Sequence, residues 1–258
     1  MTRETVGLVL KTNPLNLAKV AAARLSGKDA VVDSGGIKLV IGTRRGEGVF
    51  CALKGRQYEE IIRFLRIAQH INAGSLFLDV GANIGTYAVR VAKQNPSLRV
   101  VAIEALPWNR ARIRRSAELN RCAVETPECG ISDVEGTCTV PLQSQGRASV
   151  RAPQPIGSVT FPTVTIDHLA KLYESTPLRL LKIDVDGMCQ QALQGGITTL
   201  SQCQTVIYFE NDAGVANFLR GLGYVVGSWG TDQFKETDEG WALWALPPSF
   251  VASAQGLV

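Results

Sequence analysis

One acidic residue, two glycines and an asparagine gather in a single turn of the sequence, DVGANIGTY. The apolar run LFLDV that leads into this turn predicts a buried strand, and the regular spacing of apolar residues after it predicts a helix. In an open parallel sheet, ligands bind beyond the carboxyl ends of the strands. A ligand is therefore expected first at this turn, beside Asp79, Gly81, Asn83 and Gly85.

The spacing of the glycines indicates which ligand suits the turn. A dinucleotide fingerprint requires G-x-G-x-x-G, but Asn83 takes the place of the second glycine, where a side chain would obstruct a pyrophosphate. The G-K-[ST] of an ATP-binding loop is absent as well. A compact zwitterion fits better, with Asp79 available to an ammonium group and the amides near Gly81 available to a carboxylate. S-adenosylmethionine is such a ligand, and we expect it as the cofactor.

A second acidic residue supports the same ligand. The stretch VVAIE predicts the next strand and ends in Glu104, where a carboxylate can accept hydrogen bonds from both hydroxyls of a ribose. Asp79 or Glu104 taken singly could equally be a capping or salt-bridged carboxylate. An acid at the end of each of the first two strands favours binding of a nucleoside-containing cofactor.

Charged residues also occur in a later strand, LRLLKIDV, where Lys182 and Asp184 share one face. Charges in a central strand are costly unless they are paired or functional. Methyl transfer from a sulfonium is an in-line displacement that mainly needs alignment, but a hydroxyl acceptor gains about 10²- to 10⁴-fold from a base. Asp184 is the first candidate for that base, and a structural pair between Lys182 and Asp184 is the alternative.

His168, in TIDHLA, is the second candidate base because its pKa range suits proton transfer. A surface or capping role is the simpler interpretation for a histidine there, and Asp167 is expected to cap the helix that follows. Three acids, Asp184, Asp186 and Glu210, could together hold Mg²⁺. Nothing in their spacing requires an ion, and we expect no metal site.

Strands and helices alternate from residue 76 to residue 222, which predicts an α/β fold with a parallel sheet buried on both faces. The stretches 223–229 and 240–248 predict a C-terminal antiparallel strand pair. Before the alternation, a helix that ends at Gly27 and short strands within 29–54 predict an N-terminal cap. We therefore expect a cap over residues 1–55 and a catalytic domain over 56–258. The Gly-, Pro- and Ser-rich stretch 141–162 predicts a long loop.

The net charge of +4 is unevenly distributed, because residues 1–121 carry 20 Lys and Arg against 9 Asp and Glu, a net +11. Solvated helix faces are one interpretation, and a weak peripheral contact with an anionic membrane is the other. The arginines of residues 108–121 are spread around their helix without interleaved aromatics, so nucleic acid is not an expected partner. No apolar stretch has the length of a membrane span or of a secretory signal, and the six cysteines lack a C-x-x-C pair. We therefore expect a cytoplasmic location with reduced thiols. A peripheral position at the inner face of the membrane is the variant.

Taken in order, DVGANIGTYA, VVAIEALPWN, ELN, SDVEG, TVTIDHL and LLKIDVDGMCQQALQGG resemble the FkbM family of S-adenosylmethionine-dependent methyltransferases over about residues 56–212. The resemblance implies a Rossmann-like class I methyltransferase fold. It also implies cofactor binding by Asp79, Gly81, Asn83, Gly85 and Glu104, with Ser132 and Asp133 on the adenine side. Two positions depart from the family pattern, since Asp186 replaces a usual Glu and Ser116 a common Asn.

The expected function is transfer of a methyl group to a hydroxyl oxygen of a carbohydrate, glycolipid or polyketide-type acceptor. The oxygen acceptor is an implication of the resemblance. N-methylation of a small amine is the alternative among enzymes. A catalytically silent protein that keeps the cofactor pocket is the alternative outside them.

Overall fold

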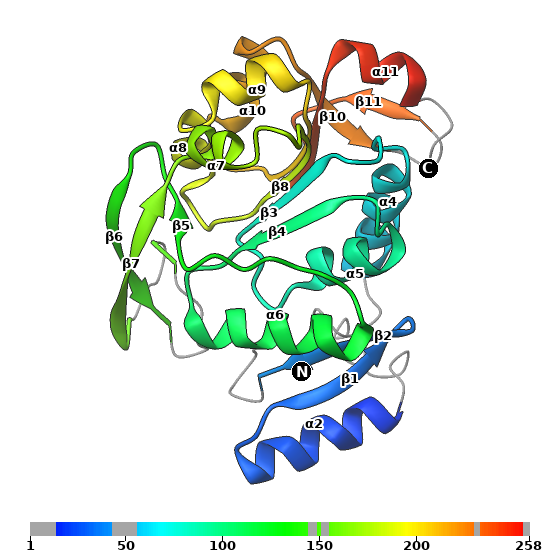
Figure 1. Ribbon diagram of the computed structural model, residues 1–258, viewed down its shortest axis with the longest axis vertical. Coiled ribbons are helices and arrows are strands. Elements are labelled where there is room, and N and C mark those ends of the chain that lie inside the picture. Colours follow the sequence, from blue (N-terminus) through cyan, green and yellow to red (C-terminus); the bar gives the residue numbers. More distant parts are fainter. Residues whose placement is uncertain (1–13, 43–55, 144–148, 151–154, 230–232, 255–258) are drawn as a thin grey trace.

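The fold is taken from a computed structural model that describes residues 14–42, 56–143, 149–150, 155–229 and 233–254. Its main element is a sheet of seven strands in the order β11-β10-β12-β9-β8-β3-β4 (Figure 1). The strands are β3 (Leu76–Val80), β4 (Arg99–Ile103), β8 (Leu178–Ile183), β9 (Val206–Glu210), β10 (Val225–Trp229), β11 (Phe234–Glu236) and β12 (Ala242–Leu246).

The central part of this sheet is parallel and its C-terminal part is not. β4, β3, β8 and β9 run parallel. β12 pairs antiparallel with both β9 and β10, so the last long strand lies between two earlier ones. The expected antiparallel pair is therefore present, and its later strand is the one inserted into the sheet. This order, with the reversed strand β12 inserted beside β9 and a second reversed strand, β11, at the edge, confirms the expected Rossmann-like class I methyltransferase fold.

Two hydrophobic cores cover the two faces of the sheet, which explains why its strands are apolar at nearly every position. Leu76, Leu78 and Val80 of β3 point into one core, whereas Phe77 between them points into the other. The Phe77 face is covered by α4 (Arg56–Gln69), α5 (Thr86–Gln94) and α6 (Pro107–Asn120). The opposite face is covered by α7 (Ile166–Leu172), α8 (Cys189–Gln194), α9 (Ile197–Cys203) and α10 (Val215–Gly221), and α11 (Pro248–Ala254) follows β12 (Figure 1).

A small second sheet stands beside the first, in the order β5-β7-β6. It comprises β5 (Gly130–Ile131), β6 (Gly136–Leu142) and β7 (Gly157–Val164), and β6 and β7 pair antiparallel along their whole length. The prediction of a long loop over 141–162 was therefore wrong at both ends. One face of this hairpin is open to water, and the apolar residues of the other face, Cys138, Val140, Val159 and Phe161, alternate with Thr, Ser and Pro. The many Gly, Pro and Ser residues of the stretch nevertheless favoured a loop.

The segment between β8 and β9 contains two helices, α8 and α9, separated at Gly195 and Gly196. A Cβ on Gly195 would lie 2.2 Å from the carbonyl oxygen of Ser132, so the chain passes another backbone too closely for a side chain. Asp167 does not cap α7, because Thr165 does so through His168 N. The Asp167 carboxylate instead accepts from the amides of Thr198 and Thr199 and caps α9.

The N-terminal unit consists of α2 (Pro14–Ser26), β1 (Ala30–Ser34) and β2 (Ile37–Ile41), and it packs on α6 (Figure 1). Side chains of α6 bind the backbone of β2: the amide of Lys38 donates to Asn120 Oδ1, the amide of Val40 donates to Ser116 Oγ, and Asn120 Nδ2 donates to the carbonyl of Lys38. These contacts occupy one edge of β2, while β1 pairs with the other edge of β2.

Buried arginines hold the same unit in place. The expectation of a solvated surface is wrong for Arg110 and Arg112 of α6, which are buried, whereas Arg114, Arg115 and Arg121 are exposed. Arg112 is buried and makes a two-pronged ion pair with Asp29, with both N–O distances 3.0 Å. Arg90 of α5 is buried and donates to the carbonyl and hydroxyl of Ser34. No helix within the described ranges combines the length and apolar character that crossing a membrane would require.

Candidate active site

The turn after β3 is shaped by the strand beside it. Gly81 has a φ of +72°, and a Cβ there would lie 1.9 Å from the carbonyl oxygen of Asp184. Lys182 Nζ donates to the carbonyl of Gly81 at 2.9 Å. Gly85 has a φ of +81° at the start of α5, where a Cβ would lie 3.0 Å from Ile113. These glycines permit close approach of β8 and α6, and Gly81 also lines the cleft described below.

Asp79 lies beneath the turn and is completely buried. Its Oδ2 accepts from the amide of Ala88, and its Oδ1 lies 3.4 Å from Lys182 Nζ. Burial raises the pKa of Asp79, and the nearby Lys182 charge and the Ala88 amide oppose this. Asp79 is not among the residues that line the cleft. Its position does not support the expected contact with a ligand ammonium group, and it indicates that Asp79 holds α5 and Lys182 in place.

Glu104 follows β4 and does line the cleft. Its Oε2 accepts from the amide of Asn83 at 2.8 Å, and its Oε1 accepts from the amide of Leu106 at 2.9 Å. Asn83 has a φ of +53°, a conformation that asparagine tolerates better than most residues. Burial raises the pKa of Glu104, and the two amides oppose that rise. The carboxylate is thus fixed in orientation, and each oxygen keeps a lone pair for a hydroxyl donor.

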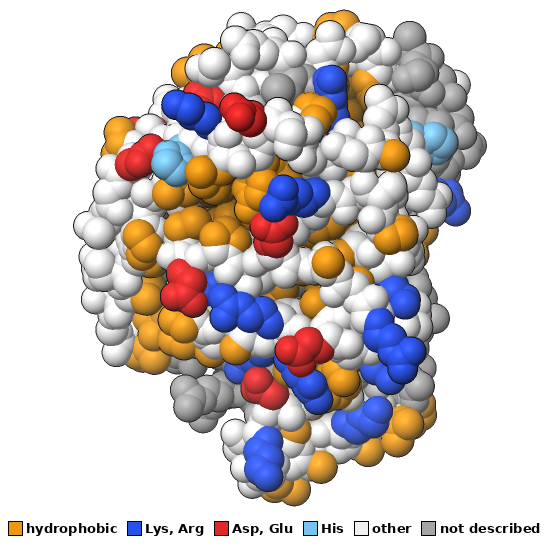
Figure 2. All heavy atoms as spheres, viewed as in Figure 1, with side chains coloured by type: hydrophobic (Ala, Val, Ile, Leu, Met, Phe, Trp, Pro, Cys, Tyr) orange, Lys and Arg blue, Asp and Glu red, His pale blue; other side chains and the backbone are white. Residues whose placement is uncertain are grey.

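The cleft runs along the carboxyl ends of β3, β4 and β8 and encloses about 1280 Å³ including its open mouth. One end is walled by Leu106, Asn109, Gly130 and Ile131 and by Val140 and Phe161 of the small sheet. The other end is walled by Ile61, Tyr87, Met188 and Trp241, with Asp184 and Asp186 beside them. Figure 2 shows hydrophobic side chains gathered in a recess between the small sheet and the central sheet. Glu104 lies between an apolar end of the cleft and the end that holds Lys182 and Asp184.

Lys182 lies between two carboxylates. Its Nζ is 3.4 Å from Asp79 Oδ1 and 3.6 Å from Asp184 Oδ2, and its side chain is only 4% exposed. Burial by itself would lower the pKa of Lys182, but Asp184 and Asp79 outweigh burial and raise it, so the ammonium group stays charged. The side chain of Asp184 is 41% exposed. The expected pair exists, and Asp184 is the member of it that is open to a ligand.

Several residues of the cleft were not predicted from the sequence. Asn109 donates to Asn83 Oδ1 at 3.3 Å and lines the apolar end. Tyr87 and Trp241 line the other end, and Tyr208 lies between them, with ring centroids 5.9 Å from Tyr87 and 6.4 Å from Trp241. Trp241 is 43% exposed, and Asn211 holds the chain before it by donating to the carbonyls of Asp238 and Gly240. Trp241 follows an irregular segment, and no sequence pattern around it indicates which residues of other strands lie beside it.

Besides Asp79 and Gly85, three predicted site residues lie outside the cleft lining. His168 Nδ1 is 2.8 Å from Glu135 Oε1, on α7 and away from β8. Ser132 and Asp133 face α8, where Gln191 donates to both side chains. The two residues just before them, Gly130 and Ile131, are the ones that reach the cleft. The adenine side therefore stays a prediction, and the side chains of Ser132 and Asp133 contact α8.

Acidic oxygens do meet near the end of β8. Asp184, Asp186 and Glu210 can bring one oxygen each within 4.8 Å of one another, and Cys189, Glu210 and Asp212 form a second such group. Burial raises the pKa of the Cys189 thiol well above its usual range, which disfavours the thiolate that binds metals. Acidic groups at a surface are common without an ion, so these clusters do not define a metal centre.

Sheet order and site together define a class of protein. A parallel sheet with one inserted reversed strand, an acid fixed after the second strand and a cleft across the strand ends are the features of a class I methyltransferase. Residues 79–226, more than half of the chain, match the methyltransferase FkbM domain. The chain therefore belongs to the FkbM family of S-adenosylmethionine-dependent methyltransferases. The predicted family is confirmed, and membership of this methyltransferase family supports S-adenosylmethionine as the cofactor.

The individual proteins that this chain resembles are distant from it in sequence. 31-O-demethyl-FK506 methyltransferase FkbM from Streptomyces tacrolimicus is 33% identical over 82 residues, which span 31% of this chain and 32% of that protein. Methyltransferase FkbM from Methylobacillus flagellatus KT superposes with a TM-score of 0.47 at 16% identity, over 68% of this chain and 44% of that one. The tRNA (uracil-54, C5)-methyltransferase from Pyrococcus abyssi, in complex with S-adenosyl-L-homocysteine, superposes with a TM-score of 0.48 at 14% identity, over 84% of this chain and 44% of that one.

Proposed function

We propose that this protein transfers a methyl group from S-adenosylmethionine to a hydroxyl oxygen of a small-molecule or glycan acceptor, of carbohydrate, glycolipid or polyketide type. The observation that carries the proposal is that one cleft has both Glu104 along it and Asp184 toward one end. An acid fixed by two amides suits a ribose, and a half-exposed carboxylate at the other end suits an acceptor. The name of the Streptomyces relative, which specifies an O-demethylated acceptor, supports oxygen as the methylated atom.

The residues present fit the cofactor. Glu104 would accept from the ribose hydroxyls, and Asn83 and the turn beside Gly81 would lie along the nucleoside and amino-acid portions. The apolar walls of Leu106, Ile131 and Phe161 would cover an adenine ring. When bound, the cofactor supplies an electrophilic methyl group on a sulfonium.

The chain itself then orients the acceptor and accepts its proton. Asp184 would take the hydroxyl proton, since its carboxylate is open to the cleft while its backbone is fixed by a hydrogen bond from its amide to the carbonyl of Val80. Lys182 holds the carboxylates of Asp79 and Asp184 and the carbonyl of Gly81 around one ammonium group. Ile61, Tyr87 and Trp241 would exclude water from this end of the cleft.

Two of these walls lie outside the segment shared with the family. Ile61 precedes residue 79, and Trp241 follows residue 226. They come from elements that the family match leaves unspecified, so they are suited to select this protein's own acceptor. A half-exposed indole on the same cleft wall as two carboxylates disfavours an anionic acceptor and suits one that has both hydroxyl groups and an apolar face.

Calorimetry with S-adenosylhomocysteine, followed by transfer of labelled methyl groups to a panel, tests the proposal. The panel pairs alkyl glycosides and polyhydroxylated macrolides with their amino-sugar counterparts. Label on hydroxyl-only acceptors, reduced in Trp241→Ala, is the expected result. Label only on amino compounds would favour N-methylation instead. Cofactor binding without transfer to any acceptor would favour a silent binding protein.

A further inference from the structure

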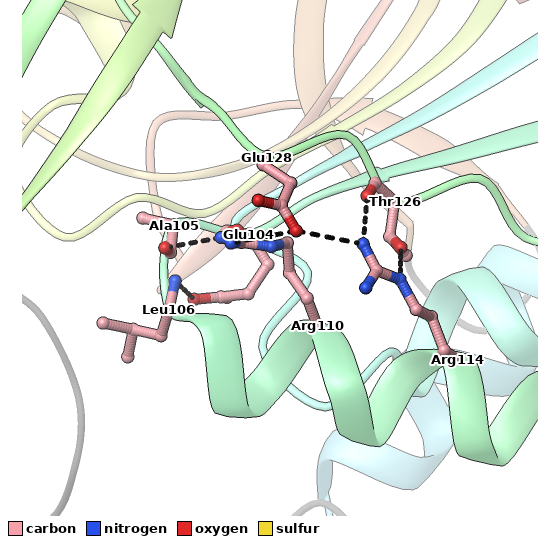
Figure 3. A network of polar contacts seen from close by, with 7 residues as sticks. All are labelled: Glu104, Ala105, Leu106, Arg110, Arg114, Thr126 and Glu128. Carbon is pink, nitrogen blue, oxygen red and sulfur yellow. Dashed lines mark hydrogen bonds and ion pairs between the residues drawn. The ribbon is translucent and has the colours of Figure 1, made fainter.

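One arginine joins the two walls of the cofactor end of the cleft. Arg110 lies on α6 and is only 6% exposed. Its Nη1 donates to the carbonyls of Glu104, at 3.0 Å, and Ala105, at 2.7 Å (Figure 3). The backbone of Glu104 is thereby held on one side while its carboxylate is held by two amides on the other.

The same guanidinium reaches the opposite wall. Arg110 Nη2 lies 3.6 Å from Glu128 Oε1, two residues before Gly130 in the segment that lines the cleft. Arg114, one helical turn further along, lies 3.5 Å from the same Glu128 oxygen and donates to the hydroxyl and carbonyl of Thr126 (Figure 3). The side chain of Glu128 is 70% exposed, whereas that of Arg110 is 8% exposed. The buried end of this network is therefore the one at Glu104.

A cation in this place sets where the Glu104 carboxylate points. The peptide groups of Glu104 and Ala105 turn their carbonyls toward Arg110, and the following amide, that of Leu106, turns toward Glu104 Oε1. An arginine presents several donors in a planar fork, so one side chain can bind two carbonyls and face a carboxylate together. A lysine has a single ammonium nitrogen and cannot span the same three partners.

We propose that Arg110 is a positioning residue for ribose recognition, acting through Glu104 and without touching the cofactor. The inference rests on the proposed cofactor site. It predicts that loss of Arg110 weakens binding selectively where the ligand carries the ribose hydroxyls that Glu104 would accept. A general loosening of the fold would weaken all adenosine ligands alike.

The test compares S-adenosylhomocysteine with its 2′-deoxy analogue by calorimetry on the full chain. Wild-type protein should bind S-adenosylhomocysteine more tightly by about tenfold, because the analogue lacks one hydrogen bond to a carboxylate. In Arg110→Ala this ratio should fall to about twofold or less, and in Arg110→Lys it should be intermediate. Melting temperatures identify any variant that does not fold, in which case Arg110→Lys alone decides.

Arg114→Ala is the matched control, because Arg114 shares Glu128 and the same helix but contacts neither Glu104 nor Ala105. It should keep the wild-type ratio. A wild-type ratio in Arg110→Ala, or in Arg110→Lys where only that variant folds, would overturn the inference and leave the proposed function standing. Failure of the wild-type protein to bind S-adenosylhomocysteine would refute the proposed cofactor site, and the inference with it.

Discussion

Asp184 can be a base, or it can be a structural partner of Lys182, and the two roles predict different losses. Asp184→Asn keeps the shape of the side chain but cannot take a proton. If Asp184 is the base, turnover should fall by about 10²-fold or more while affinity for S-adenosylhomocysteine stays near the wild-type value. Steady-state rates on an acceptor found in the panel, with calorimetry beside them, measure both quantities.

The structural alternative has its own signature. Asp184→Asn would then lower the melting temperature, because the buried ammonium group of Lys182 would lose one of its two carboxylate partners. Asp186→Asn is the comparison, since it changes a neighbouring carboxylate of the same cleft wall. Equal losses of turnover in both variants would count against Asp184 as the specific base.

Glu104 predicts a pH dependence of cofactor binding. Burial raises its pKa above the ordinary 4.5, so the carboxylate becomes protonated at a pH where an exposed glutamate would still be charged. Protonation removes an acceptor for a ribose hydroxyl, so affinity for S-adenosylhomocysteine should fall as the pH drops through this raised pKa. In Glu104→Gln, affinity should be lower by about tenfold or more and should no longer change over that range.

The effect on stability has the opposite sign. Because the folded-state pKa of Glu104 is raised, its contribution to stability is fully present below 4.5 and is lost as the pH rises through the folded pKa. Loss of binding at mildly acidic pH therefore cannot come from unfolding through Glu104. If the affinity of wild-type protein and of Glu104→Gln changed with pH in parallel, another group would be responsible.

The turn between β3 and α5 depends on one glycine because of its neighbour β8. Gly81→Ala should destabilise the protein by about 3 kcal/mol or more, since a Cβ would meet the Asp184 carbonyl at 1.9 Å and the backbone is left-handed. Gly36→Ala is the matched control, because Gly36 has a φ of +83° with nothing within 4 Å of the added Cβ. It should cost only about 1 to 2 kcal/mol.

Urea denaturation of the two variants measures the difference between them. A similar cost for both would mean that β8 moves away easily and that only the backbone conformation restricts the turn. A large excess for Gly81→Ala would identify the contact between the two strand ends as the constraint.

The elements that were predicted well are those whose sequence pattern is local. β3 begins and ends as predicted, because its apolar run is buried on both faces and stops at Gly81, whose left-handed backbone begins a turn. The hairpin of β6 and β7 was missed because its short apolar alternation contains Pro141 and Pro162 and lies in a stretch rich in Gly and Ser, which favours a loop. The reversed position of β12 depends on pairing across the sheet, which a strand's own residues do not record.

The site divides in the same way. Glu104 was predicted to reach the ligand, and it lines the cleft because it ends a strand of the parallel sheet. Asp79 also belongs to a strand end, but one more residue of strand follows it, so it faces α5 and is buried there. Arg110 was assigned to the surface because helical periodicity alone cannot show that the loop after β4 and the segment before β5 cover it.

The basic N-terminal half serves internal contacts at several places, since Arg90, Arg110 and Arg112 are all buried. Figure 2 shows Lys and Arg side chains and acids near one another on the face around α6 and α2. α2 turns Val20 and Ala23 inward and leaves Leu15, Lys19 and Leu25 exposed. This arrangement favours a structural cap, and contact with an anionic membrane remains a prediction.

Sedimentation with anionic liposomes tests the membrane contact. Each cation near a charged surface contributes about 1 kcal/mol, screened by salt, so any binding should be weak and should disappear at physiological ionic strength. Neutral liposomes are the control. Absence of lipid-dependent pelleting at low salt as well would leave the N-terminal unit as a cap alone.

The side chains that α6 presents to β2 also bear on self-association. A bare strand edge offers its amides and carbonyls to any other strand, which is how many proteins begin to aggregate. Ser116 and Asn120 bind the backbone groups of Lys38 and Val40 that face away from β1. The helix therefore covers an edge of β2 that would otherwise be open to another strand. The double variant Ser116→Ala, Asn120→Ala should accordingly show concentration-dependent light scattering at temperatures where it is still folded. Scattering only after melting would mean that these side chains are not needed to prevent association.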